Sequence, residues 1–471
     1  MDGRVRHRQA AKAAFVPVTG KSSEEVDAST GQAQNSFGWQ LFRLILLGFY
    51  ELIACSCLHF VQFLAAPLYF WNKPLYYTFQ SLVKSYFILL LAQITSIWAP
   101  VKVRISASAS ISPQLHLSKD GILRSDFPSR LVLIANHQIY TDWIYLWWIA
   151  YTSGTQGHFF IILKESLRYL PIIGPGMMFM SFIFLSRKWT TDKPRFRYRL
   201  QKLNARMLFS PRKTALSTVL EDLRSAITST PPPAPPPKSV TEAKTSAELA
   251  DELKQQDSTT LDPMWLLLFP EGTNLSPNAR RTSARWAAKQ GREDLKHTVL
   301  PRSTGLLYCL QELQGTVDWV YDCTVGYSGV RTGDFAADMY GIWRNYGEGR
   351  APEYIDMYWR GWKVKDIPLN DEKAFGDWLT KRWEEKDALL EIYQTTGKFP
   401  PSEEPIGLNG SAREESEMVK TRAGWIETEI KPTHPLEIVQ IFMPVVVLCL
   451  VWYWIVGLKN WSLKLLGLKT G

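Results

Sequence analysis

Cysteine is scarce in this chain: five occur among 471 residues, an odd number. They are scattered through mostly apolar stretches, as Cys55, Cys57 and Cys449 illustrate. A small disulfide scaffold needs many paired cysteines in a much shorter chain, so this scarcity argues against one. The sequence also contains no C-x-x-C pair. We therefore expect neither a structural zinc site nor any other bound metal.

The sequence has no G-x-x-x-x-G-K-[ST] phosphate loop, so nothing in it supports nucleoside triphosphate chemistry. Its charge is unbalanced, because 54 Lys and Arg against 45 Asp and Glu give a net charge of +9. This excess suits a chain that works beside anions such as phospholipid headgroups, phosphorylated substrates or nucleic acid. The aromatic residues, however, gather in apolar stretches, and no nucleic-acid-binding motif is present. We therefore predict no nucleic-acid partner.

Charge is absent from one long stretch near the C-terminus, residues 438–458. A helix of that length reaches ~30 Å, which matches the hydrocarbon thickness of a bilayer. We therefore predict a transmembrane helix at 438–458. The tail at 459–471 carries three lysines and no acid, which suits a cytoplasmic side under the positive-inside rule.

A second membrane region is predicted at residues 38–100. The stretch 44–71 is nearly free of ionisable groups, and Lys84 is the one charge of the stretch 75–98. We expect an N-terminal membrane helical hairpin whose helices either span the bilayer or lie partly sunk in its interface, since a buried unpaired charge is costly. Residues 1–37 are polar and begin with several arginines, and we expect a disordered basic arm there.

Between the membrane regions the sequence predicts a water-soluble α/β domain. Short apolar runs indicate buried strands at residues 131–135, 159–163, 182–185, 265–269 and 319–325. Helical segments lie between several of these runs, which favours a mixed, mainly parallel sheet. The proline-rich stretch 228–262 cannot continue a helix or a central strand, so we expect a surface insertion. Residues 401–431 are polar and turn-rich, which predicts a linker to the last helix.

One motif, NHQIYTD at residues 136–142, directly follows the strand expected at 131–135. Five residues on a continuous helix rotate by roughly 140°, so His137 and Asp142 would not face each other there. A turn after His137 that leads into a helix can instead fold the carboxylate onto one ring nitrogen. That contact would fix the tautomer and leave the other nitrogen free to accept a proton, as in a serine-protease triad without its serine. A single such spacing can also arise by chance.

A second motif, FPEGT at residues 269–273, follows the strand expected at 265–269. Pro270 stops the strand, and Gly272 allows the backbone to approach a ligand closely. Glu271 and Thr273 add polar groups at this strand end. Taken alone, the motif is equally consistent with an ordinary turn that exposes a solvated glutamate.

Together and in this order, the two motifs resemble the glycerolipid acyltransferase superfamily, the PlsC-like 1-acylglycerol-3-phosphate acyltransferases. FLSR at 184–187 stands where that family has its G-x-x-[FI]-x-x-R block, although Ser181 replaces the usual glycine. LPRSTG at 300–305 looks like its fourth, proline-containing block. The resemblance covers roughly residues 130–327. Residues 320–327 and 375–400 further resemble the branch with the lysophosphatidylinositol and lysocardiolipin acyltransferases.

The resemblance implies a PlsC-like acyltransferase domain at residues 101–335 with a C-terminal extension at 336–400. It implies that His137 is a general base oriented by Asp142. The residues that it assigns to binding of the acceptor's phosphate and glycerol portion are Arg187, Glu271, Gly272, Thr273, Pro301 and Arg302. A lysophospholipid hydroxyl would attack the acyl-CoA thioester directly, with acyl-CoA as co-substrate and no further cofactor. The helix expected at 375–393 is predicted to cover the core, with lipid contact as the alternative.

Several acceptors and roles stay open on the sequence. Lysophosphatidylinositol is the first choice of acceptor, followed by lysophosphatidic acid and then lysocardiolipin. The endoplasmic reticulum membrane precedes a mitochondrial membrane as the expected location. Arg187 also opens the basic run 187–213, which instead offers contacts to anionic lipid headgroups or CoA phosphates. The alternative from a different class is a non-catalytic scaffold that binds membrane lipids, against which the intact His137 and Asp142 argue.

Overall fold

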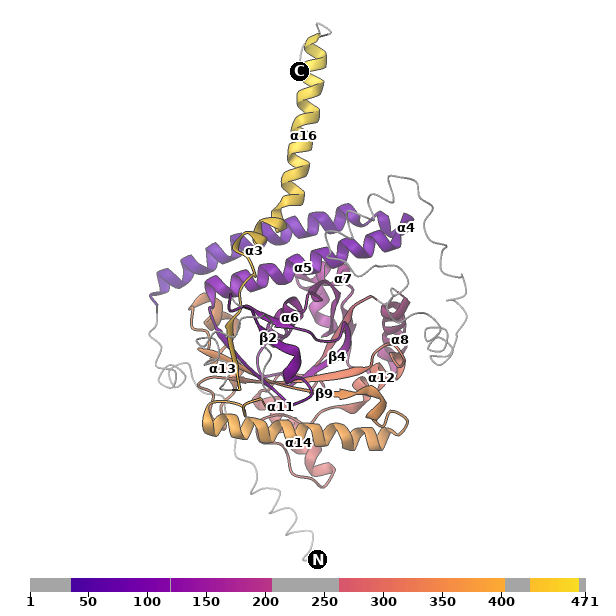
Figure 1. The fold of residues 1–471 in the computed structure, drawn as a ribbon, viewed down its shortest axis with the longest axis vertical. Helices are drawn as coiled ribbons and strands as arrows, with labels where there is room; N and C mark the ends of the chain where they lie inside the picture. The colour runs from indigo at the N-terminus through magenta and orange to yellow at the C-terminus, as the bar shows by residue number, and fades with distance from the viewer. Residues whose placement is uncertain (1–34, 119, 206–261, 403–423, 466–471) are drawn as a thin grey trace, which may run out of the picture.

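The computed structural model describes residues 35–118, 120–205, 262–402 and 424–465 (Figure 1). An eight-stranded sheet forms its centre, in the strand order β10-β1-β9-β8-β4-β7-β5-β6. The strands are β1 (Lys102–Ala107), β4 (Arg130–Ala135), β5 (Phe159–Lys164), β6 (Ile183–Leu185), β7 (Met264–Leu268), β8 (Trp319–Tyr327), β9 (Tyr354–Lys363) and β10 (Ile426–Glu429). Within this sheet β1–β10 and β8–β9 pair antiparallel, and the other neighbours are parallel. A separate antiparallel pair is formed by β2 (Leu115–Leu117) and β3 (Leu123–Ser125). The mixed, mainly parallel sheet predicted from the sequence is confirmed.

Helices cover both faces of the sheet, which explains why its central strands are almost wholly apolar. All six residues of β4 are buried. Leu131 and Leu133 join the core beneath the N-terminal helices, whereas Val132 and Ile134 join a second core on the opposite face. The helices that cover the first face are α3 (Phe37–Ala65), α5 (Lys73–Trp98), α6 (Asp142–Thr152) and α7 (Ile173–Phe179). Those on the second face are α8 (Trp189–Ala205), α12 (Ser303–Glu312) and α14 (Glu372–Thr396).

Helix α14 contains the helix expected at 375–393, and its apolar side chains pack into the second core. The prediction that this helix covers the core is therefore confirmed. Strand β10, in contrast, lies inside the stretch 401–431 that was predicted to be a linker. Its sequence IETE alternates buried and exposed residues at the edge of the sheet, next to β1. Such a short, half-solvated strand leaves little apolar signal in the sequence.

The N-terminal hairpin consists of α3 (Phe37–Ala65) and α5 (Lys73–Trp98), joined by the short α4 (Leu68–Trp71). Both helices run across the top of the domain in Figure 1. The most apolar stretch of α5 is 67% buried, whereas that of the α3–α4 segment is 22% buried. Lys84 points into the protein, where its ammonium lies 3.6 Å from the centre of the Phe160 ring. The charge of α5 thus faces the domain, and α3 presents an apolar outer surface.

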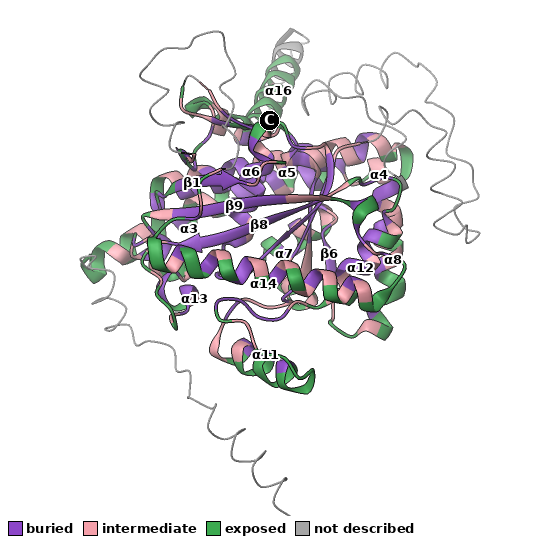
Figure 2. Cartoon of the chain, turned by 60° about the horizontal axis from the view of Figure 1, so that its bottom comes forward, coloured by how far each residue is buried: buried purple, intermediate pink, exposed green. Residues whose placement is uncertain are grey.

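Helix α16 (Val439–Leu465) stands away from the domain, and Figure 2 colours most of its described residues as exposed. Its most apolar stretch is 6% buried. The three helical segments, 37–71, 73–98 and 435–459, are long and apolar enough to cross a membrane. The predicted basic arm at 1–37 and the proline-rich insertion at 228–262 lie almost entirely outside the described residues.

Candidate active site

The turn after β4 brings His137 and Asp142 together. Asp142 is the first residue of α6, and its Oδ2 lies 2.8 Å from Nδ1 of His137. The same oxygen accepts hydrogen bonds from the backbone N–H groups of Gln138 (2.6 Å) and Ile139 (3.0 Å). The Tyr327 hydroxyl donates to Oδ1 from the end of β8. Asp142 is fully buried, so these four donors replace the water that it loses.

The imidazole of His137 is held on two sides. Asp142 bonds one nitrogen, and the ring stacks on Phe269 with centroids 4.2 Å apart and an interplanar angle of 17°. No described residue hydrogen-bonds to Nε2, and 19% of the side chain is exposed. A neutral imidazole whose Nδ1–H donates to a carboxylate presents Nε2 as an acceptor. The ring is therefore rigidly placed with its basic nitrogen open.

Glu271 lies beneath this turn, with an exposed fraction of 2%. Its Oε2 accepts the backbone N–H of His137 at 3.2 Å, and its Oε1 accepts Nε1–H of Trp383 at 3.3 Å. Burial raises the pKa of the Glu271 carboxyl to about 8. The resemblance assigns this side chain to the acceptor substrate, but in the structure it is buried and its carboxylate holds the backbone of the turn that carries His137.

The remaining residues of the FPEGT motif (269–273) and of the LPRSTG block (300–305) meet around Gly272. Gly272 has φ +70°, in the left-handed region that favours glycine, and its Cα faces the Arg302 side chain. The backbone N–H of Arg302 donates to Pro270 O at 2.8 Å, which fixes the segment with Pro301 beside this turn. The Thr273 hydroxyl donates to the carbonyl of the next residue at 3.4 Å. The NHQIYTD, FPEGT and LPRSTG blocks therefore lie together, and we call the surface that they form around His137 the rim.

The fourth contribution to the rim is Arg187, which follows β6. Burial lowers the pKa of its guanidinium, and the nearby charge of Arg302 lowers that pKa further. Both side chains are exposed, and neither forms an ion pair with another described residue. Two neighbouring arginines without an acid form a site suited to a phosphate group, because the guanidinium fork matches phosphate oxygens. Ser181, at the family's glycine position, has φ +63°, which explains why glycine is usual there.

Sequence reasoning missed the residues that hold the rim from behind. Lys386 is fully buried on α14, and its ammonium lies 2.6 Å from Asp322 in β8. Arg360 of β9 bonds the other carboxylate oxygen of Asp322 at 2.7 Å. The signal was present: an aspartate in the middle of the apolar strand WVYDCTVGY requires buried cationic partners. Trp383 lies one turn before Lys386 and reaches Glu271.

Comparison with known proteins gives matches along most of the chain. The family model "Acyltransferase" matches residues 121–328, and "Acyltransferase C-terminus" matches residues 348–423. The chain is 40% identical over 373 residues to 2-acyl-1-lysophosphatidylinositol acyltransferase of Saccharomyces cerevisiae, which is 75% of this chain and 84% of that protein. No solved structure matches the chain significantly.

More distant relatives carry a different name. A probable 1-acyl-sn-glycerol-3-phosphate acyltransferase 5 of Arabidopsis thaliana is 30% identical over 271 residues, 58% of this chain and 55% of that protein. The 1-acyl-sn-glycerol-3-phosphate acyltransferase gamma of Homo sapiens is 30% identical over 269 residues, 57% of this chain and 54% of that protein. Given these matches, the chain belongs to the glycerolipid acyltransferase family and is an enzyme that transfers acyl groups to a hydroxyl.

Proposed function

We propose that this enzyme transfers a fatty acyl group from acyl-CoA to the free hydroxyl of a lysophospholipid. The observation that carries the proposal is the His137–Asp142 pair, in which Nδ1 is bound at 2.8 Å and Nε2 is open. Arg187 and Arg302 supply positive charge on the same rim, where the phosphate of the acceptor would bind. No cofactor enters the proposed reaction besides the acyl donor.

In the proposed reaction, Nε2 of His137 accepts the proton of the acceptor hydroxyl while the hydroxyl oxygen bonds to the thioester carbonyl carbon. Asp142 keeps the imidazole in the correct tautomer and stabilises the imidazolium that forms. The carbon–sulfur bond then breaks, and the departing CoA sulfur takes the proton from His137. The products are a diacyl phospholipid and free CoA. General-base catalysis of this kind contributes roughly 10²–10⁴-fold, and the rest must come from orientation of the two substrates.

Lysophosphatidylinositol is the acceptor that we propose first, because the Saccharomyces cerevisiae relative bears that name and is covered over 84% of its length. Lysophosphatidic acid comes second, on the names of the plant and human relatives. Lysocardiolipin comes third. We also propose the endoplasmic reticulum membrane as the location of the enzyme.

The test uses the full-length protein in phospholipid vesicles with one acyl-CoA and a panel of these three lysophospholipids. We expect free CoA to appear fastest with lysophosphatidylinositol. We expect His137→Ala to abolish CoA release while the variant stays in the membrane fraction. Undiminished CoA release by the purified His137→Ala variant would contradict the mechanism, and a higher kcat/KM for lysophosphatidic acid would replace the first acceptor by the second.

A further inference from the structure

A cavity of about 330 Å³ adjoins the catalytic turn on the side of α14, and we call it the α14 cavity. Gln138, the neighbour of the catalytic histidine, and Tyr327, which bonds Asp142, both line it. Its volume is at the lower end of the ~300–1,000 Å³ typical of small-molecule sites. Most of its lining is apolar, including Leu275, Val325 and Leu390, while Gln138, Thr332 and Gln394 add amide and hydroxyl groups.

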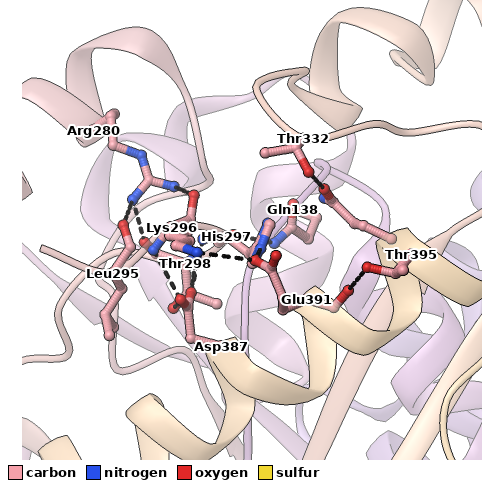
Figure 3. A network of polar contacts seen from close by, with 11 residues as sticks. Gln138, Arg280, Leu295, Lys296, His297, Thr298, Thr332, Asp387, Glu391 and Thr395 are labelled. Carbon is pink, nitrogen blue, oxygen red and sulfur yellow. Dashed lines mark hydrogen bonds and ion pairs between the residues drawn. The ribbon is translucent and has the colours of Figure 1, made fainter.

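The rim of the α14 cavity is stiffened by the network in Figure 3. Asp387 of α14 accepts the backbone N–H groups of Lys296 (2.8 Å), His297 (2.7 Å) and Thr298 (2.9 Å). Arg280 of α11 (Pro277–Lys289) donates to the carbonyls of Lys296 (2.6 Å) and Thr298 (2.7 Å). Helix α11 and the loop 295–298 are therefore fixed against α14, so the cavity is formed before any ligand arrives.

Helix α11, whose Arg280 lines this cavity, carries a row of basic residues on its exposed side. Arg281, Arg285 and Lys289 recur every four residues, so they form one exposed row, which we call the α11 stripe. None of the three forms an ion pair with another described residue. The acids that follow the helix are Glu293 and Asp294, and Asp294 faces Arg280, 3.8 Å away, on the cavity side. Trp286, 52% exposed, lies next to the stripe.

The α11 stripe lies far from the membrane helices. In Figure 1, α3 and α16 are at the top of the molecule and α11 is near the bottom, and Figure 2 shows α11 projecting beyond the sheet at the end opposite α16. The basic helix α8 has the opposite placement, since Lys202 lies 5.4 Å from the Tyr69 ring centre and 5.5 Å from that of Tyr77, both in the hairpin region. A ligand that reached this basic surface would arrive from water and not from the bilayer.

We propose, on the basis of the proposed function, that the α14 cavity and the α11 stripe together bind the acyl-CoA donor from the aqueous side. The pantetheine arm is narrow, mostly apolar and contains two amides, which matches the α14 cavity and its amide groups. The nucleotide end carries three phosphates, which the α11 stripe attracts, and Trp286 offers a face for the adenine ring. The thioester then enters the rim beside His137, while the lysophospholipid approaches from the membrane helices.

The experiment compares two donors with the same acyl chain, acyl-CoA and S-acyl-pantetheine, on the full-length protein in lysophospholipid-containing vesicles. We expect the triple variant Arg281→Glu/Arg285→Glu/Lys289→Glu to lower the ratio of kcat/KM for acyl-CoA to that for S-acyl-pantetheine about tenfold. Added salt should reduce the same ratio in the parent protein, because it screens the phosphate contacts. The matched control, Lys365→Glu/Lys373→Glu/Lys381→Glu, reverses three exposed charges on or just before α14 and should leave the ratio unchanged.

The cavity is tested separately with Thr332→Trp, which places a large ring at an exposed lining position. We expect it to raise KM for both donors by a similar factor and to leave KM for the lysophospholipid unchanged. An unchanged ratio of the two donors' kcat/KM values in the triple variant would overturn the proposal. A rise in its KM for the lysophospholipid, in place of its KM for acyl-CoA, would also overturn it and would assign the α11 stripe to a membrane surface. Absence of acyl transfer by the parent protein from either thioester would instead refute the proposed function itself.

Discussion

The centre and the edge of the catalytic rim are built in opposite ways. At the centre, the turns after β4 and β7 place Asp142 and Glu271 in full burial, each bonded to the backbone that carries His137. At the edge, β6 is flanked by Ser181 and Arg187, both with positive φ, and the arginine is exposed. Several hydrogen bonds fix the backbone at the centre, whereas the edge has strained backbone and an exposed arginine. On the proposed function, the centre would fix the geometry of His137 and the edge would bind the acceptor.

Asp142→Asn should have the largest effect, because it removes the carboxylate that sets the tautomer of His137. An asparagine at an equivalent position of a catalytic triad lowers kcat about 10⁴-fold, and we expect a loss of that order. Steady-state kinetics should show the loss in kcat with little change in lysophospholipid KM. An unchanged thermal unfolding curve would show that the variant still folds. An unchanged kcat in this folded variant would show that Asp142 does not orient His137 for the reaction.

Glu271→Gln should change how stability depends on pH. The folded pKa of about 8 exceeds the unfolded value, so the folded protein binds more protons between pH 4.5 and 8. The free energy of unfolding should therefore fall as pH rises through this window, by roughly 2–4 kcal/mol. The variant should lose that slope. Denaturant unfolding at pH 5, 6.5 and 8 measures it, and parallel slopes for both proteins would show that Glu271 is charged throughout.

Arg187→Gln and Arg302→Gln test the edge of the rim. Each removes a cation next to the site expected for the acceptor phosphate, so lysophospholipid KM should rise about tenfold per arginine. The value of kcat should change far less than in the Asp142 variant. An initial-rate series over lysophospholipid concentration at saturating acyl-CoA measures both constants. A large fall in kcat with unchanged KM would show that these arginines act in the chemical step and not in binding of the lysophospholipid.

Ser181→Gly should have the smallest effect and the opposite sign. The substitution relieves a left-handed conformation at φ +63°, although glycine gains more entropy on unfolding. We expect a net stabilisation of about 0.5–1 kcal/mol, visible as a small rise in Tm with unchanged kinetics. A lower Tm in the variant would mean that the Ser181 hydroxyl stabilises the folded protein by more than the left-handed backbone conformation costs.

The sequence predicted the central strands and the blocks of the site well, because both depend on local patterns. Continuous apolar runs such as 131–135 indicate strands with both faces covered. The spacing from His137 to Asp142 requires a turn, and the structure contains that turn. Both features can be read from neighbouring residues, without knowledge of the rest of the chain.

The direction of Glu271 was not predictable in the same way. A motif identifies the residue at a strand end but not the partner that its side chain finds, and here that partner is Trp383, 112 residues later. Strand β10 was missed for a related reason, since its pairing with β1 joins residues more than 300 positions apart. Long-range partners of this kind leave no periodic pattern in the sequence.

Helix α6 also connects the candidate site to the base of the C-terminal helix α16. Its first residue, Asp142, steadies the imidazole, and Tyr151 near its other end hydrogen-bonds Thr433 (2.7 Å) and Glu437 at the foot of α16. These two residues are nine positions apart on one helix, which separates them by ~14 Å along its axis. A displacement at the base of α16 would therefore act, through this one helix, on the turn that carries His137.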